Sequence, residues 1–395
     1  MKIICEKCNF SMNLDESRIP EKGAKGKCLK CQHIFTIKHP VSIPKSISEP
    51  VLTPAADVQT KKKPVVDSAV DSNADSNADS NVDSQTTLYW LQGGGCGGDT
   101  WAFFNSEPPD TSELINDLNI RLLWHPSISN HSMAAQHKLN DDLLSGRQSL
   151  DILCIEGSII RGPGGTGMFD TLLGKPKKDI AATLASKARY VLAIGTCASF
   201  GGIGADGEIE ATGMQFHKWE PGGFMGKNFK TKSGLPIINL PGCPCHGGVI
   251  SGVFTALLSG IPLELNEYNI PLEWYGTMVH QGCTRNEYHE YRVEEKKIGE
   301  KGCLFFYLGC HGPLVYGPCN KMLWNRRSSK TRVGVPCFGC TRPDFPQQYP
   351  FFKTRNIEGI PIELPDGVNR AHYLAYKGIA AAAAPERLKK RKTGI

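Results

Sequence analysis

The residues of this chain best suited to chemistry are its cysteines, of which there are 15. They fall into two groups, one between Cys5 and Cys31 and the other between Cys96 and Cys340. The chain begins with MKIICEKC, which contains neither a basic region followed by an apolar stretch nor a twin-arginine pair. An odd number of cysteines without such a leader favours metal binding by reduced thiols over a disulfide framework, and it predicts a cytoplasmic protein.

The first group consists of two CxxC pairs, Cys5 with Cys8 and Cys28 with Cys31, which are separated by 19 residues. Each pair supplies two thiolates from one tight turn, and two pairs complete a tetrahedral site without an open position. This spacing predicts a structural zinc site in a ribbon over residues 1–38, with rubredoxin-like iron as the alternative. Whether the ribbon docks to a protein or nucleic acid, or only stabilises its own fold, stays open.

In the second group, three cysteines follow apolar runs that predict strands. The runs are TLYWLQ before Cys96, YVLAIG before Cys197 and LPIINLPG before Cys243. Because they alternate with helical segments such as PKKDIAATLASKA, they predict a parallel sheet covered by helices on both faces. The carboxyl ends of parallel strands meet at one edge, and the glycines beside these cysteines let the backbone approach a bulky group. The three thiolates therefore predict a metal site.

Three cysteines leave one corner of a cubane iron–sulfur cluster without a ligand, since such a cluster takes four. Asp99, three residues after Cys96 in CGGD, is the natural fourth ligand, and its carboxylate oxygen is an uncommon but possible one. Cys245 is the alternative, although it also fits a passive buried thiol. Cys154 lies inside a predicted strand and is expected to pack in the core.

Composition divides the rest of the chain. Residues 39–86 lack cysteine and contain the near-repeat DSNADSNADSNVDS, so they are expected to form a flexible linker. Residues 87–260 hold the predicted sheet, and residues 261–395, rich in Gly, Pro, Cys and aromatic residues, predict a loop-rich domain organised around metal. The net charge of +6 is mild and no apolar run reaches the length of a membrane span, so neither nucleic acid nor a membrane is expected as a partner.

From about Leu88 to Pro385 the chain resembles the small subunit of nickel–iron hydrogenases. The motifs that carry the resemblance are, in order, WLQGGGCGGDT, DILCIEGS, AIGTCASFGGI, GLPIINLPGCP, HQGCTRN, KGCLFFYLGCHGP and CNKMLWNRRSSKTRVGVPCFGCTRPDFP. The resemblance is strongest to the uptake hydrogenases of cyanobacteria and their relatives, and the N-terminal segment is similar to bacterial zinc ribbons. It implies a flavodoxin-like first domain, which agrees with the α/β, doubly wound parallel sheet predicted above.

The resemblance also implies three iron–sulfur clusters, each with its own ligand set. The proximal set, for a cluster of four or three irons, is Cys96, Asp99, Cys197 and Cys243. The middle set, for a three-iron cluster, is Cys319, Cys337 and Cys340. The distal set, for a four-iron cluster, is His280, Cys283, Cys303 and Cys310.

At three positions the sequence departs from the family pattern or offers an alternative ligand. Asp99 stands where most relatives have cysteine, which bears on the nuclearity and potential of the proximal cluster. Lys330 lies close to the position where most relatives place a proline beside the middle cluster, and a lysine is a poor ligand. His289 is the alternative imidazole near the distal set, and it is expected to face solvent.

By resemblance, the chain transfers electrons for a large subunit that carries the nickel–iron site and splits dihydrogen. Electrons would pass singly through the proximal, middle and distal clusters to an acceptor that the sequence does not identify. No catalytic residue is expected in this chain, although Glu156, in IEGS, is a candidate to support a polar path or the contact between the two subunits. The alternative is a hydrogen sensor that signals to a partner protein. The complete cysteine sets argue against a DNA-binding regulator with a degenerate hydrogenase module.

Overall fold

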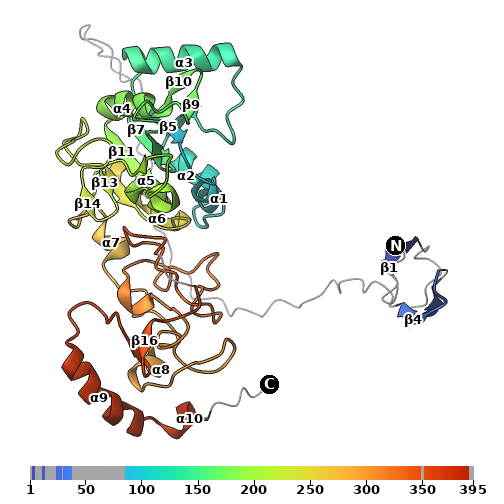
Figure 1. Cartoon of the computed structure of the whole chain (residues 1–395). Coiled ribbons are helices and arrows are strands. Elements are labelled where there is room, and N and C mark those ends of the chain that lie inside the picture. Colours follow the sequence, from blue (N-terminus) through green and yellow to red (C-terminus); the bar gives the residue numbers. More distant parts are fainter. Residues whose placement is uncertain are drawn as a thin grey trace, which may run out of the picture. The chain divides into compact units, whose positions relative to one another are not determined.

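The structure is a computed structural model, and it describes residues 2–4, 11–13, 24–28, 30–37, 85–347 and 351–390. The chain divides into two compact units, Met1–Ala78 and Asp79–Ile395 (Figure 1). Cys5, Cys8 and nearly all of the expected linker lie outside the described residues. Within the described ranges, no helix combines the length and the apolar character needed to cross a membrane.

The described part of the first unit consists of two antiparallel hairpins. Their strands are β1 (Lys2–Ile4) with β2 (Ser11–Asn13), and β3 (Ala24–Lys27) with β4 (Ile34–Ile37). Backbone hydrogen bonds at Cys28 close the turn between β3 and β4, and Cys31 lies in the same turn. One tight turn therefore presents both cysteines, as a CxxC pair of metal ligands requires.

The second unit contains a five-stranded parallel sheet. In spatial order its strands are β15 (Ile238–Leu240), β11 (Tyr190–Ile194), β7 (Ile152–Glu156), β5 (Thr86–Gln92) and β6 (Ile120–Trp124). The chain starts at β5 and winds outward in both directions, which is the flavodoxin-like order. Every residue of β7 and β11 is buried, which explains their nearly continuous apolar runs. The expected doubly wound α/β fold is confirmed.

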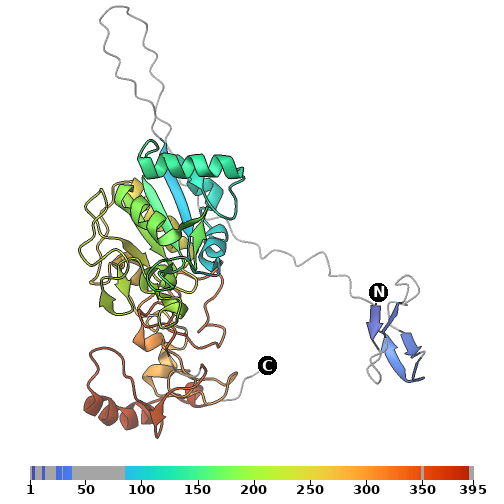
Figure 2. The same ribbon diagram turned by 45° about the horizontal axis from the view of Figure 1, so that its top comes forward.

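Helices cover both faces of this sheet. One core contains Trp90, Phe103 and Phe254 and is covered by α1 (Gly98–Phe104), α2 (Thr111–Asp117) and α6 (Gly247–Leu258). The other contains Leu143 and Leu184 and is covered by α3 (Met133–Ser145) and α4 (Lys177–Lys187), which lie side by side in Figure 2. α4 lies where the sequence predicts a helix. We call residues 85–260 the sheet region.

Short elements connect the main strands of the sheet region. They are α5 (Gly195–Phe200), η2 (Gly202–Gly204) and the paired strands β8 (Ile159–Ile160) with β12 (Ala211–Thr212), β9 (Thr171–Leu172) with β10 (Lys175–Pro176), and β13 (Phe216–His217) with β14 (Glu220–Pro221). Of these, α5 matters most for the site, because it begins directly after β11 and carries Cys197.

The rest of the second unit, residues 261–347 and 351–390, has few regular elements and is called the cluster region here. Its elements are α7 (Leu272–Tyr275), α8 (Asn286–Glu290), η3 (Gly312–Leu314), β16 (Asn356–Ile357), β17 (Ile360–Pro361), α9 (Arg370–Ala382) and α10 (Glu386–Lys389). Its core combines Phe305 and Phe306 with three cysteines, Cys303, Cys310 and Cys337. Three of the nine buried residues in this core are therefore cysteines.

Candidate metal centres

The carboxyl edge of the sheet brings the three strand-end cysteines together with Asp99. Cys96 lies between β5 and α1, Cys197 lies in α5 after β11, and Cys243 follows β15. Partial desolvation raises the pKa of the Cys243 thiol, which is still partly exposed, to about 11, and the nearby Cys340, Cys197, Asp99 and Cys96 add to that rise. The four side chains of the proximal set therefore lie within electrostatic reach of one another.

Two glycines allow the side chains of Asp99 and Cys197 to lie directly against the backbone. A Cβ atom at Gly195, whose φ is +81°, would lie 2.2 Å from Asp99 Oδ2. A Cβ atom at Gly202, whose φ is +59°, would lie 2.5 Å from Cys197 Sγ. Both positions thus require glycine for the backbone conformation and for the close approach.

Asp99 is buried in the first turn of α1. Its Oδ1 accepts a hydrogen bond of 2.6 Å from the amide of Cys245. No group in the described ranges donates a hydrogen bond to its Oδ2, the oxygen that faces Gly195. Burial raises the pKa of Asp99 to about 7, the Cys245 amide opposes this rise, and the charge of Glu156 adds to it. One oxygen is thus held by the backbone, while the other lies against Gly195 and receives no hydrogen bond from a described residue.

Cys245 and Cys154 both have fully buried thiols. Cys245 Sγ lies 3.7 Å from Tyr275 Oη and 3.7 Å from the carbonyl oxygen of His246. Burial raises the pKa of the Cys245 thiol well above its ordinary value, and Asp99 raises it further. Cys154 packs within β7 in the apolar core, as expected for a buried thiol.

Glu156, at the end of β7, organises the Cys96–Asp99 turn. Its carboxylate is buried and accepts hydrogen bonds from Trp90 Nε1 at 2.9 Å, from the Asp99 amide at 3.1 Å and from the Thr100 amide at 3.0 Å. The Thr100 hydroxyl donates a further hydrogen bond to the same carboxylate. A carboxylate with these partners caps the N-terminus of α1, where negative charge is favourable. Glu156 therefore holds the turn that presents Cys96 and Asp99.

The middle set lines a single cavity of about 440 Å³. Its walls include Cys319, Cys337 and Cys340, together with Cys243 of the proximal set. Burial raises the pKa of Cys319 to about 11; Cys340 adds to the rise and the Lys330 ammonium opposes it. The Lys330 Nζ atom lies 4.7 Å from the centroid of the Phe338 ring, so a cation–π contact holds this exposed cation at the cavity wall.

A buried polar network lies beside the middle set. Asn320, which directly follows Cys319, donates from Nδ2 to the carbonyl of Val279 at 2.6 Å and to Thr331 Oγ1 at 3.0 Å. The Ser329 hydroxyl donates to Asn320 Oδ1. Thr331 lines both the cavity of the middle set and the cavity of the distal set. This network therefore joins the walls of two candidate sites.

The distal set lines one small cavity. All four predicted residues contribute to its wall, and they are His280, Cys283, Cys303 and Cys310. Backbone amides point at two of the sulfur atoms: Arg285 N lies 3.3 Å from Cys283 Sγ, and Cys337 N lies 3.3 Å from Cys310 Sγ. Such amide–sulfur contacts are a known means of tuning a cluster potential.

His289 does not face solvent as the sequence led us to expect. Its ring centroid lies 4.3 Å from that of His280 and 5.4 Å from that of Phe306, and its Nδ1 lies 3.6 Å from Cys303 Sγ. Burial, with the nearby His280 and Arg292, lowers the pKa of His289 to about 3. The short helix α8 turns His289 inward onto the aromatic core, which the sequence pattern does not reveal.

The thiols of the middle set are spread around a cavity rather than gathered at one point. In the part of the chain that the structure describes, no three His, Cys, Asp or Glu side chains are grouped as the ligands of one ion would be. Cys319, Cys337 and Cys340 instead line a cavity of about 440 Å³. An iron–sulfur cluster needs ligands spaced in this way, one at each corner, rather than ligands around one atom.

Sequence reasoning did not find the residues that hold the ligands in place. Thr100 and Asn320 each directly follow a predicted ligand, and that adjacency is their only sequence signal. Trp90 has the pattern of a core residue, and its hydrogen bond to Glu156 spans 66 residues of sequence. Contacts of this kind depend on the tertiary fold.

Three protein families match successive parts of the chain. Residues 275–353 match the family that describes the C-terminal part of NiFe/NiFeSe hydrogenase small subunits. Residues 96–257 match the NADH ubiquinone oxidoreductase 20 Kd subunit family, and residues 1–36 match a zinc-ribbon domain. The three matches fall on the cluster region, the sheet region and the ribbon, respectively.

Individual relatives lead to the same family. The chain is 30% identical over 287 residues to the F420 non-reducing hydrogenase II small subunit of Methanosarcina mazei, an alignment that covers 66% of this chain and 74% of the relative. It is 30% identical over 267 residues to the periplasmic [NiFe] hydrogenase small subunit of Solidesulfovibrio fructosivorans, covering 66% of this chain and 78% of the relative.

Solved structures share the fold. The actinobacterial-type NiFe-hydrogenase from Ralstonia eutropha H16 has a TM-score of 0.64 at 23% identity, over 79% of this chain and 94% of that chain. The [NiFeSe] hydrogenase from Desulfovibrio vulgaris Hildenborough has a TM-score of 0.60 at 27% identity, over 68% of this chain and 98% of that chain. The parallel sheet, the cysteine sets and the similarity to these relatives lead to one conclusion. The chain belongs to the small subunits of nickel–iron hydrogenases, which transfer electrons for a large catalytic subunit.

Proposed function

We propose that this chain holds three iron–sulfur clusters in series and conducts electrons from dihydrogen oxidation in the large subunit to an external acceptor. The observation that carries the proposal is that neighbouring sets share walls. Cys243 of the proximal set lines the cavity of the middle set. The amide of Cys337, in the middle set, donates to Cys310 Sγ of the distal set at 3.3 Å. Bound clusters would supply one-electron redox chemistry, and this chain contributes their ligands and spacing.

Electrons are proposed to enter this chain at the proximal set. Cys96 and Cys243 are exposed, although the strands that precede them are buried. Trp101 on α1 is 66% exposed, and Ile203, which follows Gly202 beside Cys197, is 74% exposed. Exposed apolar side chains next to exposed thiols favour coverage by another protein surface. We therefore assign the surface around Cys96, Cys243, Trp101 and Ile203 to the contact with the large subunit.

We propose that Asp99 supplies the fourth ligand of the proximal cluster through Oδ2. Two features support this: the Cys245 amide holds Oδ1 at 2.6 Å, and Oδ2, which lies against Gly195, accepts no hydrogen bond from a described residue. Cys245 is the less suitable ligand, because its thiol is fully buried and lies 3.7 Å from Tyr275 Oη. A carboxylate oxygen is a harder ligand than a thiolate, so its bond to iron is the one most easily lost. The cluster would then exist in four-iron and three-iron forms.

The other nuclearities follow from the donors present. The middle cavity offers the thiols of Cys319, Cys337 and Cys340, and its fourth side carries Lys330, whose ammonium does not donate an electron pair. Three irons are therefore proposed for the middle cluster. The distal cavity offers three thiols and the imidazole of His280, which matches the four corners of a four-iron cluster.

For the first unit we propose a structural zinc ion held by Cys5, Cys8, Cys28 and Cys31. The shared turn of Cys28 and Cys31 and the zinc-ribbon match over residues 1–36 support it. We further propose domains at 1–38, 39–86, 87–260 and 261–395, in a cytoplasmic protein. Zinc removal by a chelator should unfold residues 1–38 without bleaching the iron–sulfur absorbance; loss of both signals together would contradict these boundaries.

The test uses the complete heterodimer. Cys197→Ser and Cys243→Ser should each abolish hydrogen-dependent dye reduction while nickel stays in the large subunit, because each breaks the series at its first member. Cys154→Ala is the matched control, since Cys154 is a buried core thiol in no set. Iron and sulfide quantification with electron paramagnetic resonance (EPR) gives the cluster count. Full activity and full cluster content in either serine variant would refute the proximal assignment.

A further inference from the structure

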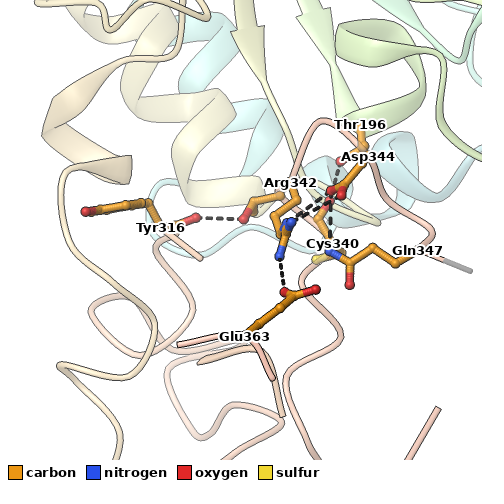
Figure 3. A network of polar contacts seen from close by, with 8 residues as sticks. Thr196, Tyr316, Cys340, Arg342, Asp344, Gln347 and Glu363 are labelled. Carbon is orange, nitrogen blue, oxygen red and sulfur yellow. Dashed lines mark hydrogen bonds and ion pairs between the residues drawn. The ribbon is translucent and has the colours of Figure 1, made fainter. Parts of the chain in front are cut away.

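Thr196 connects ligand-bearing turns of two candidate sites. Its side chain is buried, with 1% of its surface exposed, in α5 between Gly195 and Cys197. The Thr196 hydroxyl donates to the carbonyl oxygen of Cys340, 144 residues away in the sequence (Figure 3). The same hydroxyl oxygen accepts a hydrogen bond of 2.9 Å from the amide of Gly242. One hydroxyl therefore holds backbone groups from two distant turns.

The connected turns all carry proposed ligands. Thr196 is covalently bonded to Cys197, and Gly242 is covalently bonded to Cys243, so both of these turns belong to the proximal set. The Thr196 amide also donates to the Gly242 carbonyl at 2.9 Å, which closes a reciprocal pair between the two turns. Cys340 belongs to the middle set. The hydroxyl thus lies at the point where the sheet region meets the cluster region.

The Cys340 turn is held separately on its other side. The Thr341 hydroxyl donates to the carbonyl of Tyr316 at 2.6 Å. Arg342 donates to both carboxylate oxygens of Asp344, at 3.0 and 3.1 Å, and to Glu363 at 3.2 Å (Figure 3). A two-pronged guanidinium–carboxylate pair fixes orientation as well as distance. The turn is therefore anchored within the cluster region by Arg342 and to the sheet region by Thr196.

We propose that Thr196 is a positioning residue for electron transfer between the proximal and middle clusters. Its hydroxyl fixes the Cys340 turn against the Cys197 and Cys243 turns, and this sets the separation and orientation of the two clusters. The inference rests on the proposed function, since it requires clusters at both sets. The position needs a group that donates and accepts at once, which threonine and serine provide and valine does not.

The experiment compares Thr196→Val with Thr196→Ser in the complete heterodimer. Valine keeps the shape and removes both hydrogen bonds, whereas serine keeps both. Thr183→Val is the control, because the Thr183 hydroxyl donates to Asp179 O within α4 and bonds to no other described residue. The measurements are iron and sulfide content, the magnetic interaction between the proximal and middle clusters by EPR, and the rate of electron transfer from dihydrogen to the distal end. The interaction between clusters reports geometry, which a purely structural role far from the clusters would not alter.

Thr196→Val with full iron content should show a changed magnetic interaction and a several-fold slower transfer, and Thr196→Ser should restore both. Thr183→Val should match the parent. Native interaction and native rate in an iron-replete Thr196→Val enzyme would overturn the inference and leave the proposed function intact. Should Thr196→Val lose iron, Arg342→Lys decides instead, since it loosens the same turn from the other side. A changed interaction in that variant supports the inference, and an unchanged one overturns it. Parent enzyme without two interacting clusters would overturn the proposed function itself.

Discussion

The sheet region and the cluster region hold their candidate ligand cysteines in different ways. In the sheet region, aliphatic and aromatic cores on both faces hold the strands, and Cys96, Cys197 and Cys243 lie at the strand ends outside those cores. In the cluster region, Cys303, Cys310 and Cys337 are themselves part of the core around Phe305 and Phe306. The first arrangement lets a stable fold present ligands to a cofactor, whereas the second makes the cofactor part of what holds the fold.

Removing iron should therefore affect the two regions very unequally. In the iron-free chain we expect amide protons in the cluster region to exchange rapidly, while those of β5, β7 and β11 stay protected. The reason is that the sheet core consists mainly of aliphatic and aromatic side chains, whereas the cluster-region core includes cysteine thiols that bound iron would link. Hydrogen–deuterium exchange by mass spectrometry, with and without iron, measures this. Equal loss of protection in both regions would refute the comparison.

A matched pair of cysteine substitutions sharpens the same point. Cys303→Ser should lower the free energy of unfolding of the cluster region by about 1–3 kcal/mol, even before loss of iron is counted, because it buries a hydroxyl in an apolar core. Cys197→Ser, at a half-exposed strand end, should leave the stability of the sheet region nearly unchanged. Denaturant unfolding of the parent and both variants in the complete heterodimer, with iron content measured alongside, provides the measurement. A larger loss of unfolding free energy in Cys197→Ser than in Cys303→Ser would contradict this comparison of the two regions.

Glu156 offers a test inside the sheet region. Glu156→Gln replaces an acceptor-only carboxylate, which receives bonds from Trp90 and from two amides of α1, by an amide that brings its own donors. We expect a loss of about 1–3 kcal/mol in stability and faster amide exchange confined to α1. Glu113→Gln, at the exposed start of α2, is the control. Unchanged exchange in α1 would show that Glu156 does not hold the Cys96–Asp99 turn.

Asp99 should influence the cofactor rather than the fold. Asp99→Cys is expected to yield a conventional four-iron proximal cluster with an altered potential, and Asp99→Ala to favour a three-iron cluster, since one corner then lacks its ligand. EPR and iron quantification on the parent and both variants distinguish these forms. Identical spectra, iron content and potential in Asp99→Ala would exclude Asp99 as a ligand and make Cys245 the residue to test.

The last prediction, whose effect vanishes at neutral pH, is a dependence of stability on pH through His125. Its ring is buried beside Thr100 and accepts from the Ser127 amide at 3.1 Å. Burial lowers the pKa of His125 from 6.5 to about 4. The unfolded chain thus binds more protons between these two values, so the stabilising contribution is complete above pH 6.5 and falls as the pH drops toward 4. In His125→Gln, the thermal unfolding midpoint of the sheet region should change less with pH over that interval. If it changes with pH as steeply as in the parent, other groups cause the dependence.

Much of the sheet region was predictable because its signals are local. Continuous apolar runs mark strands buried on both faces, and the helix expected at residues 176–188 is α4 at Lys177–Lys187. The strand preceding Cys243 is shorter than expected, Ile238–Leu240, because the chain turns away from the sheet at Pro241 and Gly242. The candidate ligands were predictable for a similar reason. Cysteine is an uncommon residue, and a metal site requires it at particular spacings that can be recognised in the sequence.

What the sequence by itself determined, then, is which residues can bind metal and which segments form the sheet, because residue type and short periodicity carry that information. Only the tertiary structure decided how these parts are joined. The turn of His289 toward Cys303, the four hydrogen bonds that converge on Glu156, and the link from Thr196 to Cys340 all depend on chain segments that meet only after folding. A hydrogen bond across 144 residues leaves no periodic trace in a sequence, since any threonine can donate to any backbone carbonyl that the fold brings near.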